Sequence, residues 1–256
     1  MRNRIANLLR RVAMIEGLSG QDLSGQDWSG MDLSNTDLSH ANLSGTYLGG
    51  ANLVFSNLEE AVLRGADLTR VFGDSVSLIG ADLRNANLTQ AQLRHAKSHD
   101  ANFTEANLIE ADLRKANLSV AVLREANLER ANLQEASMSH ADLTNADLRN
   151  ANLRGADLSR ASLYKADLRG ADLTGAVLYH AVLNQAVLSE ANLFSANLKY
   201  TDLRNANLTN ANLKEADLTN ATVTLTDFEG ADLAGVNITA IRGYGYKGLK
   251  LPKHFL

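Results

Sequence analysis

The sequence predicts an all-β solenoid built from a five-residue unit. Three observations lead to this fold class. Leucine occupies 37 of the 45 positions that begin at Leu18 and step by five to Ile238. Alanine stands two residues before 33 of these positions, and Asp or Asn stands directly before 31 of them. The phase of the repeat never slips between Leu18 and Ile238, so no loop interrupts it.

A period of five excludes a continuous helix and a continuous flat strand. A helix turns ~100° per residue, so steps of five scatter the leucines around its axis. Side chains of a strand alternate between two faces, so an odd period places successive leucines on opposite faces. Within one unit, however, Ala and Leu are two residues apart and share a face. The chain must therefore bend after each Ala-x-Leu triplet to keep the leucines in one interior, and Gly, Asn, Ser and Asp suit such corners.

Some units depart from the rule and indicate adjustments of volume in the core. Small Ser98 is followed by large Phe103, and Gly73 is flanked by Val71 and Val76 where alanine is expected. We interpret these as compensated packing. A pocket at these positions is the alternative.

The repeat resembles the pentapeptide-repeat family over roughly residues 16 to 238. The family pattern is a small residue, Asp or Asn, Leu or Phe, and two variable polar residues, as in Ala-Asp-Leu-Arg-Asn (146–150) and Ala-Asn-Leu-Thr-Asn (206–210). The resemblance implies a right-handed quadrilateral β-helix with four units per coil, and hence about eleven coils here.

The two ends are expected to cap the solenoid, whose unpaired edges need cover. Residues 1–15 carry apolar side chains at helical spacing and predict a short capping α-helix; a helix on a membrane surface is the alternative. Residues 16–240 form the predicted β-helix. Residues 241–256 contain three glycines and Pro252 and are expected to be a capping or dimerisation tail. Related proteins dimerise through a helical C-terminal module, so a homodimer through this non-helical tail is only one expectation.

Charge and composition argue against several kinds of binding site and cellular location. The tails are basic and the body is acidic, with no Lys or Arg between Val12 and Leu63, which disfavours direct nucleic-acid binding by the body. The chain has no cysteine, which excludes disulfides and thiolate metal sites. No signal peptide or membrane-spanning segment is evident, so we expect a cytoplasmic protein without a membrane partner.

No catalytic, cofactor or metal site emerges from the sequence. His40, His140 and His180 share one surface column, but they lie too many coils apart to share a metal ion. The irregular stretch Ser98–His99–Asp100 carries the residue types of a triad, yet the repeat buries Ser98 and turns His99 outward. An enzyme working at this stretch stays open only as a minor alternative.

Function is therefore expected on the outer surface, where apolar side chains interrupt a polar pattern. One candidate partner surface lies on adjacent sides and coils, with Val187 and Phe194 elsewhere in the same region. A second candidate lies one coil apart on one side. The alternative is that β-branched and aromatic residues occur there because they suit strands, without a role in binding. The first surface comprises Val177, Tyr179, His180, Val182 and Tyr200, and the second comprises Val54, Phe55 and Phe72.

The leading hypothesis is a non-enzymatic protein–protein interaction scaffold with an unknown protein partner. The family resemblance implies an alternative, a DNA mimic that modulates type II topoisomerase (DNA gyrase), which the acidic body fits. A purely structural spacer is a further alternative.

Overall fold

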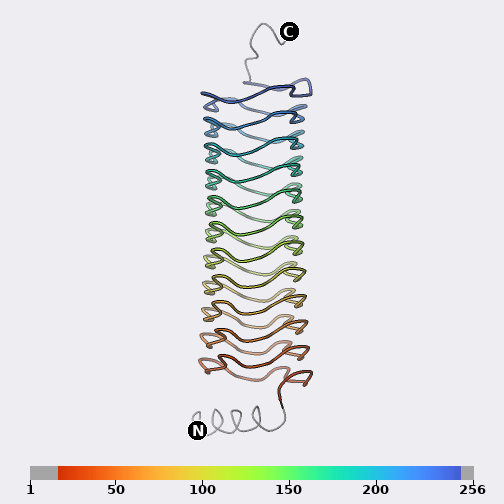
Figure 1. The fold of residues 1–256 in the computed structure, drawn as a ribbon, viewed down its shortest axis with the longest axis vertical. Helices are drawn as coiled ribbons and strands as arrows, with labels where there is room; N and C mark the ends of the chain where they lie inside the picture. The colour runs from red at the N-terminus through yellow and green to blue at the C-terminus, as the bar shows by residue number, and fades with distance from the viewer. Residues whose placement is uncertain (1–16, 249–256) are drawn as a thin grey trace.

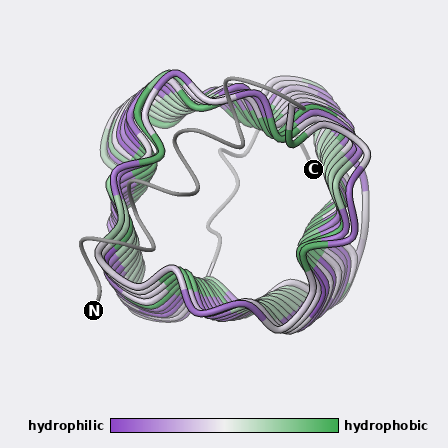
Figure 2. Cartoon of the chain, turned by 90° about the horizontal axis from the view of Figure 1, so that it is seen from below, coloured by the Kyte–Doolittle hydropathy of each residue, from purple (hydrophilic) through white to green (hydrophobic). Residues whose placement is uncertain are grey.

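The computed structural model describes residues 17–248, which form a stack of similar coils (Figure 1). The outline is four-sided when the stack is viewed along its axis (Figure 2). Residues 17–248 contain no helix and no multi-residue strand. Each side instead contributes one residue that forms a parallel bridge to the residue 20 positions later, from Asp22↔Asn42 to Asp227↔Lys247. A 20-residue step is four five-residue units, so the coil has the predicted four sides.

Every backbone N–H of a typical unit finds an acceptor, which explains the composition of the repeat. In unit 166–170, one N–H bonds to the preceding corner, three bond to neighbouring coils, and the fourth residue donates to the side chain of the second. The side chain of the Asp or Asn before leucine thus accepts the one N–H of the unit that has no backbone acceptor. The bonds are Ala166 to Leu163 O (3.0 Å), Asp167 to Ala146 O (2.9 Å), Leu168 to Val187 O (2.7 Å), Arg169 to Asp167 Oδ1 (3.2 Å) and Gly170 to Ser189 O (3.1 Å).

The predicted corner is a β-turn that starts at the leucine. The leucine carbonyl accepts a hydrogen bond from the N–H three residues later, as in Ala171 to Leu168 at 3.0 Å. The third turn residue has positive φ at every position ending in 0 or 5, from Gly20 to Gly245. A type II turn requires such a φ. Because most of these positions hold residues other than glycine, including Val120 at φ 62°, stacking of the coils must outweigh their local strain.

The leucines and alanines form one continuous core along the axis. Most of them are fully buried, and leucines 20 residues apart lie in adjacent coils. The core thins at the C-terminal end, where Leu233, Val236, Ile238 and Ile241 are only partly buried. Burial of each leucine stabilises the fold by roughly 1.5–3 kcal/mol before conformational entropy is counted.

The departures from the rule are packed as expected at Gly73. A Cβ placed there would lie 2.8 Å from Leu93 Cδ2, so the side chain of the next coil fills the space. Ser98 is fully buried and its Oγ has no hydrogen-bond partner. Ser98 therefore saves volume beside Phe103 at the cost of a desolvated hydroxyl.

The predicted capping helix at residues 1–15 lies outside the described residues. Of the predicted tail 241–256, residues 241–248 are described, and the bridges continue through Arg242 and Lys247. Within residues 17–248, no helix is long and apolar enough to cross a bilayer.

Candidate functional site

Most charged side chains on the middle coils are paired with one another. Five Asp residues are followed two positions later by an Arg that donates to the same carboxylate through Nε and a terminal nitrogen. Arg149, for example, reaches Asp147 Oδ2 at 2.6 Å and Glu129 in the previous coil at 3.1 Å. Such pairs hold side chains in place, and those whose partners are both exposed contribute little net stability. The five pairs are Asp82–Arg84, Asp112–Arg114, Asp147–Arg149, Asp167–Arg169 and Asp202–Arg204.

Asp82 has the most strongly perturbed carboxyl of this set. A side-chain hydrogen bond from Arg84, with a further bond from Arg64, lowers the pKa of Asp82 to about 2 against the cost of its partial burial. The hydrogen bonds that lower its pKa come from two guanidinium groups and a backbone N–H. The perturbation therefore reflects an ion-pair network rather than catalysis.

The first candidate surface contains three aromatic rings in mutual contact. Tyr179 and His180 occupy one corner, and Tyr200 occupies the same corner one coil on. The His180 and Tyr200 rings stack with centroids 4.8 Å apart, and Tyr179 meets both edge-on, at 4.4 Å from His180 and 5.5 Å from Tyr200. Tyr200 remains 44% exposed. These three rings, which we call the aromatic corner, form a preordered apolar surface of the kind that interfaces favour.

Three consecutive sides beside the aromatic corner carry valine where the repeat places Asp or Asn. Val177 lies on the same side as Tyr179, and Val182, which is 38% exposed, lies on the next side. Val187 follows on the third side. Valine offers no acceptor, so the N–H groups of Tyr179, Asn184 and Ser189 lack the side-chain bond that the repeat supplies elsewhere. The valines thus combine an apolar surface with outward donors. Val177 and Val182 belong to the sequence-predicted surface.

The second candidate surface is also assembled by the fold. Phe72 bridges Asn52 in the previous coil, and the Val54–Phe55 corner lies against Asp74 through the Phe55 N–H. Phe55 is 64% exposed and Phe72 is 46% exposed. They are among the most exposed large apolar side chains in residues 17–248.

The triad-like stretch has no catalytic geometry. Ser98 Oγ and His99 Nδ1 are both buried and neither has a hydrogen-bond partner, so Ser98 is not joined to a base. Among residues 17–248, no three His, Cys, Asp or Glu residues are grouped to hold a metal ion. His40 instead bonds Glu60 at 3.1 Å.

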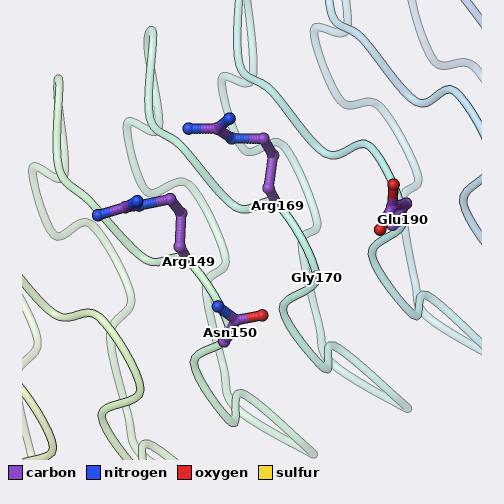
Figure 3. Close-up of a pocket in the computed structure, with 5 residues that line it drawn as sticks. All are labelled: Arg149, Asn150, Arg169, Gly170 and Glu190. Atoms are coloured by element: carbon purple, nitrogen blue, oxygen red, sulfur yellow. The ribbon is translucent and has the colours of Figure 1, made fainter.

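One shallow hollow of about 180 Å³ lies on the middle coils (Figure 3). Both arginines in it extend away from Glu190 and are bonded to Asp147 and Asp167. Ligand pockets are usually ~300 Å³ or larger and mostly apolar, so this polar hollow is a poor candidate site. It is lined by Arg149, Asn150, Arg169, Gly170 and Glu190.

The sequence analysis does not name some exposed apolar residues, although they too occupy positions where the repeat places polar ones. Tyr47 is 55% exposed at a position where the repeat places Asp or Asn, and that departure is visible in the sequence. The sequence analysis places Val187 only elsewhere in the same region, whereas position 187 carries the third consecutive valine, one unit after Val182.

The five-residue unit, the bridges at a spacing of 20 and the Leu/Ala core agree with comparison to known families. The sequence matches the family described as pentapeptide repeats across nearly all of residues 18–240. The chain belongs to the pentapeptide-repeat family. The matched ranges are 18–53, 47–72, 74–97, 101–139, 136–175, 171–210 and 211–240.

Several solved pentapeptide-repeat structures are similar to this chain. HetL from the cyanobacterium Nostoc, described as involved in heterocyst differentiation regulation, is 32% identical, with 93% of this chain and 94% of HetL covered and a TM-score of 0.40. Rfr23 from the cyanobacterium Cyanothece is 36% identical over 35% of this chain and 62% of its own, with a TM-score of 0.35. QnrB1, a plasmid-mediated fluoroquinolone resistance protein, is 17% identical over 64% and 85%, with a TM-score of 0.43. No curated protein matches the chain.

Proposed function

We propose that this pentapeptide-repeat protein is a non-enzymatic scaffold that binds a protein partner through the aromatic corner. The observation that carries the proposal is the mutual contact of three rings, Tyr179, His180 and Tyr200. Their mutual packing restricts their rotamers before a partner arrives, which reduces the entropy cost of binding.

The surroundings of the corner support the same role. Val177 and Val182 add apolar side chains to the two sides that meet at the aromatic corner. The valines at 177, 182 and 187 also leave outward N–H groups that a partner's carbonyl oxygens can accept from. An interface of this kind joins a central aromatic anchor to peripheral hydrogen bonds. The solenoid holds all of these groups on hydrogen-bonded coils rather than on loops.

The test is affinity capture from the native host with wild-type protein and with a Tyr179→Thr/Tyr200→Asn variant. Thr occupies the first of these turn positions at Thr219, and Asn occupies the second at Asn220, so the fold tolerates both replacements. The variant should lose a partner that the wild type retains. A Tyr47→Asn control, which removes a more exposed tyrosine from a distant coil, should retain it. Identical captured sets for all three proteins would argue against the proposal.

A second candidate is a DNA-mimicking modulator of type II topoisomerase. Its support is the stretch of residues 17–63, which holds six acidic residues and no Lys or Arg. The paired charges of the middle coils limit such mimicry to one end. A gyrase supercoiling assay without effect over a wide range of protein concentration would remove this candidate.

A further inference from the structure

The net negative charge of the described chain is concentrated at its N-terminal end. Residues 17–63 carry six acidic residues and no Lys or Arg, whereas residues 64–248 carry 22 acidic and 19 basic residues. The first stretch thus supplies a net charge of −6 and the much longer second stretch only −3. A cationic partner would be attracted to the first coils far more than to the middle coils.

Two exposed phenylalanines, Phe55 and Phe72, lie on the border of this acidic end. Phe55 forms the corner between two sides of the solenoid. On one side lie Val54 and, one coil on, Phe72; the other side leads through Asn57 to Glu59 and Glu60. Asp37 lies one coil back on that second side, where Asn57 Nδ2 donates to its carboxylate at 3.2 Å. We call Val54, Phe55, Phe72, Asp37, Glu59 and Glu60 the Phe55 corner.

The carboxylates of this corner keep their charge available to a partner. In the described residues, Asp37 is bonded to the Ser39 N–H and to Asn57, and Glu59 accepts from Ser77. Hydrogen bonds from Ser39 are the main cause that lowers the pKa of Asp37, so it is ionised at neutral pH. Arg94, which lies two coils on in the column of Val54, is already bonded to Asp74 through two nitrogens. Glu60 lies 3.1 Å from His40 Nδ1. Among the described residues, the three carboxylates are thus held by hydroxyl, amide, backbone and imidazole groups, and none is in an ion pair with Lys or Arg.

We propose that the Phe55 corner docks a basic polypeptide segment whose apolar side chains cover Phe55 and Phe72. Burial of the two rings would supply the affinity, and the carboxylates on the adjoining side would select Arg or Lys next to the apolar residues. The inference extends the proposed scaffold role to a second surface and does not depend on the aromatic corner.

The substitutions that test it follow residues already present in the same columns. Phe55→Asn copies Asn35, which has the same positive φ one coil earlier, and Phe72→Asn copies Asn52. The double variant F55N/F72N should therefore fold as the wild type does. Glu59→Gln/Glu60→Gln removes charge alone, and Phe194→Thr, which copies Thr174, removes an exposed phenylalanine far from the corner.

The experiment is selection of peptides from a random phage-displayed library on full-length wild-type protein, followed by affinity measurements with the selected synthetic peptides. We expect peptides that combine Arg or Lys with aliphatic or aromatic residues. F55N/F72N should weaken binding at least about tenfold, E59Q/E60Q should weaken it and reduce its salt dependence, and F194T and Tyr179→Thr/Tyr200→Asn should leave it unchanged. Raising salt from about 0.1 M to about 1 M, which shortens the Debye length from ~10 Å to ~3 Å, should weaken wild-type binding.

Three outcomes would overturn the inference. The first is a selection that yields no binder, or only binders that F55N/F72N retains. The second is a set of purely cationic peptides indifferent to Phe55 and Phe72, which would indicate a mimic of nucleic-acid charge. The third is self-association of the wild type that F55N/F72N abolishes, which would assign the corner to a second copy. If wild type and Tyr179→Thr/Tyr200→Asn capture the same proteins, the aromatic-corner proposal fails and these peptide results are unaffected. The two proposals therefore fail separately.

Discussion

In residues 22–39 each of four Asp residues is followed two positions later by Ser, whereas in the middle coils five Asp residues are followed by Arg. Both kinds of unit have the same bridges and corners. In the first, Ser24 donates its N–H to Asp22 at 3.1 Å; in the second, Arg84 adds two guanidinium bonds to Asp82. The comparison teaches that the backbone and core of this fold are indifferent to the outward residues. The surface can therefore change from charged to neutral, or from polar to aromatic, without altering the fold.

The largest expected effect tests whether the two regions share one core. Leu43→Ala in the first coils and Leu148→Ala in the middle coils each remove a fully buried side chain, so each should lower the free energy of unfolding by about 3 kcal/mol. Denaturant unfolding of both variants would measure it. Costs that differ by more than ~2 kcal/mol would break the comparison, because they would mean that one region packs loosely.

The next largest effect is the pH dependence of the stability that the Asp82 ion pairs give to the middle coils. Asp82→Asn keeps an acceptor for the Arg84 N–H but loses the ion pairs. Because the folded-state pKa of Asp82 is lowered to about 2, the stabilisation is present above its unfolded value near ~4 and is lost as the pH falls toward 2. With the side chain 18% exposed, solvent screening leaves on the order of 1–2 kcal/mol at pH 7.

Unfolding of wild type and Asp82→Asn at pH 7, 4 and 2 would check this. The difference between the two proteins should be largest at pH 7 and should vanish near pH 2. A difference that is constant over this range would mean that the variant loses packing rather than an ion pair.

A third effect concerns the corners, which are mostly glycine in the first coils and mostly larger residues in the middle. Val120 is β-branched and has φ 62°, a conformation that costs L-residues roughly 1–2 kcal/mol and that Asn tolerates better. Val120→Asn should therefore raise the free energy of unfolding by about 1 kcal/mol. If thermal and chemical unfolding are unchanged or weakened, the strain of the corner is absorbed elsewhere.

The smallest effect converts one unit type into the other. Ser24→Arg places an arginine two residues after Asp22, as in the Asp82–Arg84 unit. Because the new pair is exposed, the thermal midpoint should rise only slightly, by less than any substitution above shifts it in either direction. The rise should disappear at high salt. A salt-independent change would show that the arginine acts through packing instead.

The repeat made most of the fold predictable. Ala-x-Leu spacing required a corner in each unit. The structure adds the reason for Asp or Asn before leucine, whose side chain accepts the N–H two residues later. The number of sides came from family resemblance, because no single unit reveals which later unit it will pair with. That same pairing decides which outward residues meet. Tyr179 and Tyr200 are 21 residues apart, and only a 20-residue coil stacks their rings.

Other features depend on the surroundings of each side chain in the folded protein, which the repeat pattern does not specify. The sequence marked Ser98 as buried, but the absence of a partner for its Oγ follows from the surrounding core. The sequence marked Phe55 as exposed, but its position between an apolar side and an acidic side follows from the corner geometry.

The most direct test of the scaffold role is site-specific photocrosslinking in the native host. A benzophenone side chain at Tyr200 samples the aromatic corner, and one at Asn210 samples the corner diagonally opposite at the same height. We expect a discrete crosslinked protein from position 200 that is absent from position 210. Equal products from both positions, or none from position 200, would contradict the account.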